Sequence, residues 1–350
     1  MCDSSSFFGY IITTLDDLTF CKESMEMINV TESLTENIGK VGGENDYRDS
    51  KTSQVKSISR VYADVLASKP NSYYEYDNFS PTLEEIDNYS LIRKLGHGKY
   101  SIVFEGLQNE KNERVVIKML KPVRKRKVKR EIKILDCLKG GMNIVKLLAV
   151  VSIPHTDLTA LVFEQLIHNE DFKNIYLKLS EADTRYYLYE VLRALEYCHS
   201  RGIMHRDVKP HNIIVDQENH KIRLIDWGLA EFYHPGQEYN VRVASRYFKG
   251  TAELNTYLKK YNISVDGKLQ SMLGMHTRKS WQRFVHTEHE YLITDHAINL
   301  LESLLRIDHM ERISAREALN HKYFSHIRRK IHCKSPSLLN NVLSSPEESP

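Results

Sequence analysis

The feature that most constrains this chain is a pair of short polar segments. They read His-Arg-Asp-Val-Lys-Pro-His-Asn and, a little farther on, Asp-Trp-Gly. The carboxylate of Asp207 could accept the proton of an attacking hydroxyl, and Lys209 could neutralise charge on a transferred phosphoryl group. Asn212 and Asp226 carry oxygens that could bind Mg²⁺. The alternative is a chance polar turn between two strands, and the length of the pattern argues against it.

These segments resemble the catalytic loop and the metal-binding loop of protein kinases, in which H-R-D-x-x-x-x-N precedes D-x-G. The resemblance implies an α+β, bilobal fold, with a small β-rich lobe containing one helix and a larger, mostly helical lobe. It also implies ATP and Mg²⁺ as cofactors. The residues it assigns to catalysis are Asp207, Lys209, Asn212 and Asp226, of which Asn212 and Asp226 would bind the metal.

A glycine-rich turn between two apolar stretches is a candidate phosphate-binding loop. Gly96 and Gly98 have no Cβ, so the backbone could approach phosphate groups closely. The pattern is weak by itself, because G-x-G occurs in many hairpins and Ser101 replaces the third glycine of the kinase pattern. The residues expected to contact nucleotide here are Leu95, Gly96, His97, Gly98, Lys99, Tyr100, Ser101, Ile102 and Val103.

A lysine and a glutamate supply a candidate ion pair. Lys118 ends a run of apolar residues that predicts a buried strand, and Glu131 lies on the apolar face of a predicted helix, between Val128 and Leu135. An unpaired charge there is costly, so we expect Lys118 to pair with Glu131 and to position the α- and β-phosphates. The alternative is that both charges reach solvent independently.

The order of predicted elements indicates two lobes. Strand-like segments and one helix fill residues 89–165, the expected small lobe, and helical spacing dominates residues 166–326, the expected large lobe. One predicted helix ends near residue 200, and its His199 is expected to be a packed core residue. A hairpin is predicted over residues 213–225, an amphipathic helix over residues 292–305 and a further helix over residues 315–319. Nucleotide would bind in the crevice between the lobes. The apolar side chains expected to contact adenine are Val103, Val116, Phe163, Ile214 and Ile225.

Composition and charge distinguish the ends of the chain from its centre. Residues 1–50 hold ten acidic and three basic residues, whereas the whole chain has a net charge of +3. We expect an acidic, disordered extension at residues 1–55 and a flexible tail at residues 327–350. The five scattered cysteines argue against disulfides and a zinc site, and no apolar run has the length of a membrane span. We expect neither a membrane nor a direct nucleic-acid partner.

Basic residues are concentrated in two places. Residues 124–130 carry six positive charges in seven positions, and a second group follows the Asp-Trp-Gly segment. The first cluster could be a solvated helix face, a nuclear import signal or a site for acidic substrates. The second cluster favours acidic protein substrates, with import into the nucleus remaining compatible. The residues expected to bind substrate are Lys125, Arg126, Lys127, Arg242, Arg246 and Lys249.

Residues 60–250 resemble the catalytic alpha subunits of casein kinase II. The most specific residue is Trp227, where most kinases have Phe, and the match continues through Leu-Ala-Glu-Phe-Tyr-His-Pro-Gly-Gln-Glu-Tyr-Asn. The resemblance implies a serine/threonine kinase of acidic sites that uses ATP or GTP, in the nucleus and the cytoplasm. It implies no need for activation-loop phosphorylation, because residues 56–88 brace that loop. A dimeric regulatory beta subunit, forming a tetramer, is the implied partner.

The chain departs from this pattern after Gly250. A Pro-Glu pair and a long apolar helix should follow, but Gly250 is joined directly to Thr251, and roughly fifty residues of the family pattern are absent. Arg312 should then lack its glutamate partner, and the large lobe should be unfolded or molten. Two functions remain open, an active kinase or a non-catalytic scaffold that binds nucleotide or the regulatory subunit. A skipped exon would explain the gap.

Overall fold

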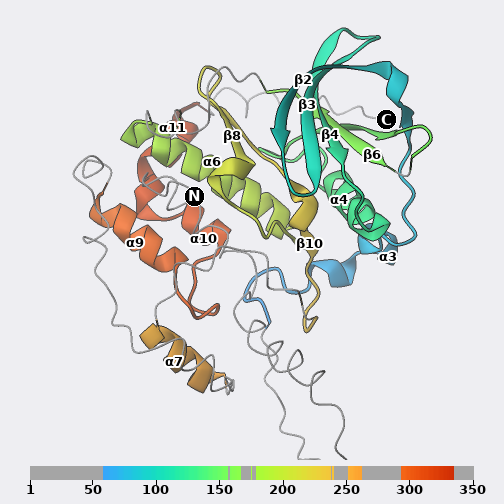
Figure 1. Ribbon diagram of the computed structural model, residues 1–350. Coiled ribbons are helices and arrows are strands. Elements are labelled where there is room, and N and C mark those ends of the chain that lie inside the picture. Colours follow the sequence, from blue (N-terminus) through green and yellow to red (C-terminus); the bar gives the residue numbers. More distant parts are fainter. Residues whose placement is uncertain are drawn as a thin grey trace, which may run out of the picture.

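The computed structural model describes residues 58–156, 158–166, 175, 179–237, 239, 251–261 and 293–334 of the 350-residue chain. Two lobes are evident in Figure 1: a β-sheet with helix α4 beside it, and a mostly helical part built around α6. The α+β, bilobal architecture predicted from the sequence is therefore confirmed. Within the described residues, no helix is both long and apolar enough to cross a membrane.

The small lobe is a six-stranded sheet in the order β1-β5-β6-β4-β3-β2. Neighbouring strands are antiparallel, except that β1 pairs with β5 in parallel. The predicted strands are all present, and β1 is an addition that the sequence pattern did not indicate. The strands are β1 (Glu84–Glu85), β2 (Tyr89–His97), β3 (Ser101–Gln108), β4 (Glu113–Leu120), β5 (Leu147–Ser152) and β6 (Thr159–Glu164).

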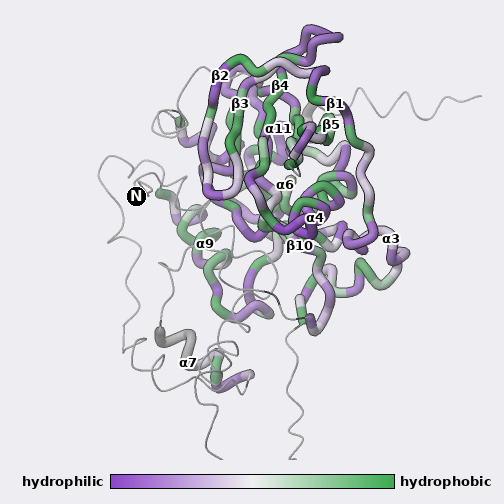
Figure 2. Tube along the Cα trace, turned by 45° about the vertical axis from the view of Figure 1, so that its right-hand side comes forward, coloured by the Kyte–Doolittle hydropathy of each residue, from purple (hydrophilic) through white to green (hydrophobic). Residues whose placement is uncertain are grey.

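Alternation along β4 separates the core of the sheet from the site. Val115 and Ile117 are almost fully buried in a small cluster with apolar residues of β5 and β6. Since successive side chains of a strand point to opposite faces, Lys118 lies on the other side of the sheet from Ile117. Figure 2 shows the hydrophobic stretches of β3 and β4 inside the lobe.

Helix α4 (Lys125–Cys137) covers the face of the sheet that carries Lys118. It buries Ile132, Ile134 and Leu135, and also the charged Glu131. The predicted helix is confirmed, although it begins three residues before the expected Val128, within the basic cluster. The basic residues at its start therefore project from the first turns of a helix.

In the large lobe, α6 (Glu181–His199) is the central helix. It begins with a capping box, in which the Ser180 hydroxyl accepts from the Asp183 amide and the Asp183 carboxylate accepts from the Ser180 amide. Tyr187, Val191 and Leu195 are almost completely buried. The helix predicted to end near residue 200 is thus confirmed, and His199 is a buried core residue as expected.

Short strands and turns follow α6 and carry the polar segments of the sequence. β7 pairs with β10, and β8 forms the predicted hairpin with β9, all antiparallel. These elements are β7 (Ile203–Met204), η4 (Pro210–Asn212), β8 (Ile213–Asp216), β9 (Lys221–Leu224), η5 (Trp227–Leu229) and β10 (Glu231–Phe232), where η denotes a 3₁₀ helix.

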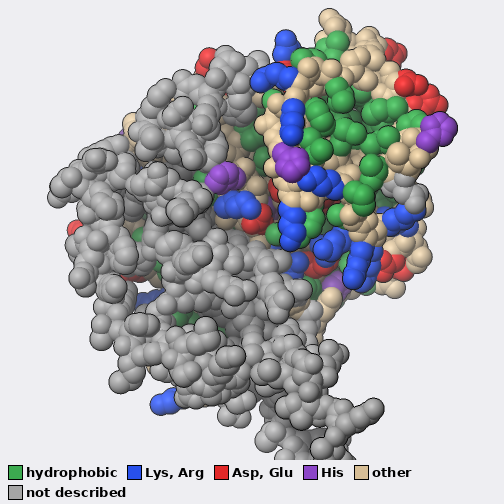
Figure 3. All heavy atoms as spheres, in the orientation of Figure 1, with side chains coloured by type: hydrophobic (Ala, Val, Ile, Leu, Met, Phe, Trp, Pro, Cys, Tyr) green, Lys and Arg blue, Asp and Glu red, His purple; other side chains and the backbone are tan. Residues whose placement is uncertain are grey.

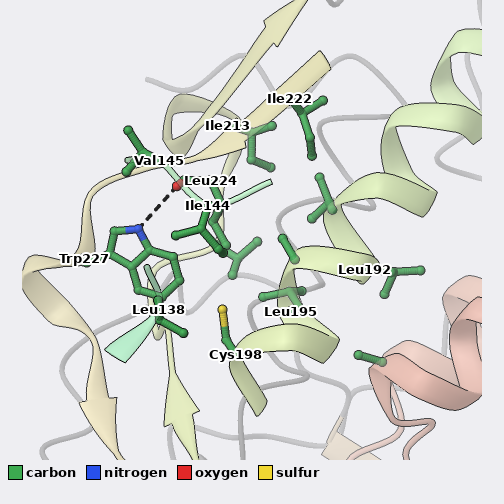
Figure 4. Packing of buried hydrophobic residues seen from close by; sticks show 14 of the residues in the cluster. Leu138, Ile144, Val145, Leu192, Leu195, Cys198, Ile213, Ile222, Leu224 and Trp227 are labelled. Carbon is green, nitrogen blue, oxygen red and sulfur yellow. Dashed lines mark hydrogen bonds between the residues drawn. The ribbon is translucent and has the colours of Figure 1, made fainter. Parts of the chain in front are cut away.

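Trp227 anchors these turns in the main core. Its side chain is almost completely buried, and its indole Nε1 donates to the Leu224 carbonyl at 3.3 Å (Figure 4). Around it lie Leu138, just after the end of α4, Ile144 and, from α6, Cys198. The segment that follows β9 is therefore held by apolar groups from both lobes.

The C-terminal part of the described chain packs on α6. Helix α9 confirms the predicted amphipathic helix, although Leu292 lies outside the described residues. Ala315–Leu319 is helical as expected. The expected tail at 327–350 is contradicted for its first residues, since α11 continues to Lys334 and Ile327 is buried. The elements are α7 (Thr251–Lys260), α9 (Asp295–Leu304), α10 (Ala315–Leu319), η8 (Lys322–Phe324) and α11 (Ser325–Lys334).

The described part of the large lobe contains one continuous apolar core. Leu192 and Leu195 of α6 share this core with Leu300 of α9 and Phe324 of η8. The helix expected after Gly250 is a different element from α6, and the low stability expected without it stays a prediction. The residues that join Tyr239 to Thr251 lie outside the described part of the chain.

Arg312 has hydrogen-bond acceptors that the sequence did not indicate. Its buried guanidinium donates from Nε to the Arg306 carbonyl at 2.7 Å and from Nη2 to the Ile307 carbonyl at 3.1 Å. The guanidinium of Arg312, for which the sequence indicated no glutamate partner, thus donates to backbone carbonyls. Asp308, the residue after Ile307, pairs with Lys260 of α7. Helix α7 is therefore attached to the loop that carries Arg312.

Residues 58–79 run along both lobes before the sheet begins. They include η2 (Val65–Ser68) and α3 (Asn71–Tyr74), and η3 (Ile86–Asn88) follows β1. At the large-lobe end, Arg60 pairs with Glu317 of α10.

Aromatic contacts attach the same stretch to the residues after η5. Tyr73 and Tyr76 pack on Phe232, with ring centroids 6.0 and 6.4 Å away, and the Ser59 amide donates to the Tyr233 hydroxyl at 2.7 Å. Residues 58–79 therefore contact the described residues after η5, as the resemblance implied.

Buried His199 predicts how stability depends on pH. Burial, with a smaller effect of the nearby His205, lowers the pKa of His199 to about 4. Unfolding restores the ordinary pKa of a histidine, so between about pH 6.5 and 4 the unfolded chain binds a proton that the native state does not. The free energy of unfolding therefore decreases as the pH is lowered through this range. His199→Leu should remove up to about 3 kcal/mol of this pH-dependent loss.

Urea unfolding of the chain and the variant at several pH values between 4 and 7 measures the effect. The matched control is His296→Leu, because His296 is exposed on α9. Equal pH dependence in His199→Leu and the original chain would contradict this account.

Candidate active site

Three residues of the first polar segment meet around one carboxylate. Lys209 Nζ donates to Asp207 Oδ2 at 2.7 Å. The Asn212 amide nitrogen donates both to Asp207 Oδ2 and to the Asp207 carbonyl, each at 2.8 Å. The Asp207 side chain is largely buried, whereas Lys209 remains partly exposed. Asp207 is thus fixed as a largely buried acceptor, with a cation beside it.

Asp226 is brought to the same place by the backbone. The Ile225 amide donates to the Asn212 carbonyl at 2.9 Å, and the His205 Nε2 donates to the Ile225 carbonyl at 3.0 Å. Because His205 Nδ1 accepts from the Asp207 amide, these partners fit a neutral ring protonated on Nε2. Both predicted loops are therefore joined through one histidine and one peptide group.

Two residues of these loops have left-handed backbone conformations. Arg206 has φ of +66° and Asp226 has φ of +60°. Such angles are uncommon outside glycine and are found disproportionately at functional sites, where surrounding contacts hold them. The Arg206 Nε–H donates to the Leu229 carbonyl at 2.8 Å, which fixes one loop against the other.

Lys118 joins the two lobes. Its ammonium group lies 2.8 Å from Glu131 Oε1 and 2.8 Å from Asp226 Oδ1, so the predicted pair with Glu131 is present and Asp226 is a second partner. Burial alone would lower the pKa of Lys118, but the two carboxylates outweigh it and raise that pKa. Burial likewise opposes ionisation of Asp226, and Lys118 nevertheless lowers the pKa of this carboxyl group.

A second connection between α4 and the segment after Asp226 was missed by the sequence reasoning. Arg130 pairs with Glu231, and its Nη2 donates to the Gly228 carbonyl at 3.3 Å. Both side chains of this pair are mostly buried. In the sequence Arg130 is one of six clustered cations, so only its position next to Glu131 distinguished it.

The predicted glycine-rich turn joins β2 to β3. The Gly98 amide donates to the Ser101 carbonyl at 2.9 Å, and Lys121 Nζ donates to the Gly98 carbonyl at 2.7 Å. An added Cβ at Gly96 would meet no atom within 4 Å. The turn is therefore open on its glycine side. The other residues predicted here lie in β2 or β3, or in the turn itself: Leu95, His97, Lys99, Tyr100, Ile102 and Val103.

The residues predicted to contact adenine lie on both lobes. Val116 of β4 stands opposite Phe163 of β6 in the strand register, and Val103 of β3 is opposite Lys118. Ile214 lies on β8 and Ile225 directly follows β9. These positions place apolar side chains on the strands that flank Lys118 and Asp226. Their contact with adenine stays a prediction.

The residues predicted to bind substrate divide into two groups. Lys125, Arg126 and Lys127 are exposed on the first turn of α4. Arg126 Nε lies 2.9 Å from Asp77 Oδ1, with its guanidinium over the Tyr76 ring. The second group lies outside the described residues: Arg242, Arg246 and Lys249.

The donors present fit a magnesium-bound nucleotide. Asp226 offers a carboxylate, and since the amide nitrogen of Asn212 bonds to Asp207, the oxygen of that amide is the atom that could bind a cation. Oxygen ligands are those that Mg²⁺ prefers. The Lys118 ammonium and the open glycine turn are suited to phosphate groups.

The comparison with known families agrees with this geometry. The model of the protein kinase domain matches residues 89–267, about half of the chain. The match begins at Tyr89, the first residue of β2, and includes Lys118, Asp207 and Asp226. Members of this family use ATP and divalent metal ions. The chain belongs to the protein kinase family.

Proposed function

We propose that this chain is a serine/threonine protein kinase that transfers the γ-phosphate of Mg²⁺-ATP, or GTP, to sites followed by acidic residues. The observation that carries the proposal is the position of Lys118, bonded at once to Glu131 of α4 and to Asp226. In an active protein kinase the lysine–glutamate pair must be formed and the aspartate must be placed to bind Mg²⁺. Lys118 makes that pair with Glu131 and also holds Asp226.

The proposed mechanism assigns one role to each polar group. Asp207 accepts the proton released by the attacking hydroxyl, and its bonds to Lys209 and Asn212 fix its orientation. Lys209 neutralises charge on the transferred group. Lys118 orients the phosphates, with Asn212 and Asp226 as the metal ligands. Bound Mg²⁺-ATP supplies the phosphoryl group and the metal charge.

Acidic specificity is supported by cations beside the site. Lys99 and Lys127 both lie over the ring of Tyr100, at 5.2 and 5.8 Å from its centroid, and Lys121 reaches the neighbouring Gly98 carbonyl. We call these three residues the Tyr100 lysine cluster. They would attract Asp and Glu side chains of a substrate. The resemblance to casein kinase II points to the same class of substrate.

A regulatory subunit dimer is the proposed partner, and the outer strand of the small lobe is a surface that could bind it. Leu91, Ile92 and Leu95 of β2 are about half exposed. Figure 3 shows a group of hydrophobic side chains on this lobe. Exposed apolar groups of this kind often mark sites of protein association. Location in the nucleus and the cytoplasm is part of the same proposal.

A second candidate function is a scaffold that binds nucleotide or the regulatory subunit without transferring phosphate. The observation that favours it is the junction at Gly250, where the family's Pro-Glu and helix are replaced by the start of α7. The two candidates share the small lobe and differ in the rate of phosphoryl transfer.

Nucleotide binding tests the part that both candidates share. Lys118→Met and Asp226→Asn should each weaken the binding of a fluorescent ATP analogue by about 10- to 100-fold, because each removes a charged contact. Lys133→Met is the matched control, since Lys133 lies on α4 over the Phe79 ring. Equal affinity of all three variants and the original chain would exclude this nucleotide site.

A peptide array tests the substrate class. We expect the full chain to select Asp and Glu at the positions +1 to +3 after Ser or Thr, and the preference to weaken as salt shortens the screening length. Lys127→Ala should reduce the preference, whereas Lys133→Ala should not. Selection of basic or proline-directed sites would contradict the acidic assignment.

Restoring the missing segment distinguishes the two candidates. We expect a Pro-Glu and helix insertion after Gly250 to raise phosphotransfer by about tenfold or more, without changing nucleotide affinity. The reason is that the nucleotide contacts are already made, whereas the substrate side depends on residues near the junction. Phosphotransfer and nucleotide titration are measured on both chains. A normal rate in the original chain would show that the segment is not needed.

A further inference from the structure

The Tyr100 lysine cluster has positive charge that its contacts do not neutralise. Lys99 and Lys127 lie over one aromatic ring, and Lys121 donates to the Gly98 carbonyl and contacts His97 Nε2 at 3.0 Å. The groups they contact are a phenol ring, a peptide oxygen and an imidazole. Cation–π contacts and carbonyl bonds stabilise an ammonium group but leave its net charge in place.

Neighbouring cations have acidic partners instead. Arg126 pairs with Asp77, and Arg130 pairs with Glu231. Lys99, Lys121 and Lys127 therefore carry excess positive charge where α4 meets the glycine-rich turn, and Lys129, which donates to the Asp77 carbonyl at 2.9 Å, adds charge on the same helix. In Figure 3, Lys and Arg side chains gather over the lower part of the small lobe. A cluster of this sign and position is suited to an acidic segment.

The chain itself contains such a segment. Residues 1–50 have a net charge of −7, from ten acidic and three basic residues, and include the adjacent pair Asp16 and Asp17. Fifty residues of chain can span at most about 170 Å. A segment of that length can reach either lobe of a domain of ordinary size.

The attachment point favours binding within one molecule. Residues 58–79 lead from Arg60, paired with Glu317 of the large lobe, to Asp77, which pairs with Arg126 at the start of α4. Figure 1 shows this stretch, in blue, passing below β10 toward α4. A tethered segment has an effective concentration in the millimolar range, so weak ionic contacts can suffice.

We propose that the acidic residues 1–50 bind the Tyr100 lysine cluster of the same molecule and compete with acidic substrates for it. This regulation rests on the proposed acidic specificity, because both occupants use the same three lysines. The segment inhibits without blocking the nucleotide contacts of Lys118. Its inhibition decreases with salt, since the contacts are exposed and screened.

Zero-length carbodiimide cross-linking tests the docking without any activity assay. An equal mixture of ¹⁵N-labelled and unlabelled full chains is cross-linked at low salt and analysed by mass spectrometry. We expect links from Asp or Glu of residues 1–50 to Lys99, Lys121 or Lys127, within one isotopic copy and lost near 1 M salt. Links only between copies, or none to these lysines, would overturn the proposal.

Peptide binding tests the competition. A fluorescent acidic peptide is titrated by anisotropy into the full chain and into two variants that each remove two negative charges, Asp16→Asn/Asp17→Asn and Glu347→Gln/Glu348→Gln. The first variant should bind the peptide about threefold more tightly, and the second should not. Equal affinities of the two variants would overturn the proposal.

The two experiments separate this inference from the proposed function. Cross-links within one copy, together with a peptide that binds neither variant, would support docking of the segment and reject acidic substrate specificity. A peptide that binds all chains equally, with no link to the three lysines, would leave the substrate class supported and reject the docking.

Discussion

The contact on which the site depends is the pair of bonds that Lys118 makes with Glu131 and Asp226. One ammonium group connects the sheet, helix α4 and the turn after β9. Lys118 and Glu131 are mostly buried, so either charge would be costly without the other, whereas the Asp226 side chain is about half exposed. The Arg130–Glu231 pair makes a second bond between the same elements. The position of α4 is thereby coupled to that of Asp226, and with it to the metal site.

Apolar packing around Trp227 supports this group of charged residues. Trp227 sits between the end of α4 and helix α6, so the residue next to Asp226 is fixed by both lobes. Ile225, which precedes Asp226, is bonded to the loop that carries Asp207: its amide donates to the Asn212 carbonyl, and its carbonyl accepts from His205. Catalytic groups from distant parts of the sequence are therefore held by a few backbone contacts around one buried aromatic ring.

The described contacts of the site do not involve the junction of Gly250 and Thr251. The contacts of Lys118 and Asp207 come from α4 and the two polar loops, and the described large-lobe core is built on α6. Arg312 bonds to backbone carbonyls, and Lys260 of α7 pairs with Asp308. Arg242, Arg246 and Lys249 precede the junction and lie outside the described residues, so their role in substrate binding stays a prediction.

The sequence by itself determined that the chain carries the catalytic and metal-binding motifs of a protein kinase, and it located most of the strands and helices. Apolar periodicity located the strands and α6, and the burial cost of Glu131 predicted its pairing with Lys118. Tertiary structure decided what periodicity does not encode. The second partner of Lys118 and the Arg130–Glu231 pair join residues about a hundred positions apart, and charge patterns along a chain do not specify such distances. Likewise, the contacts between α6, α9 and η8 in the large-lobe core join residues that are far apart in the sequence, so they follow only from the assembled core.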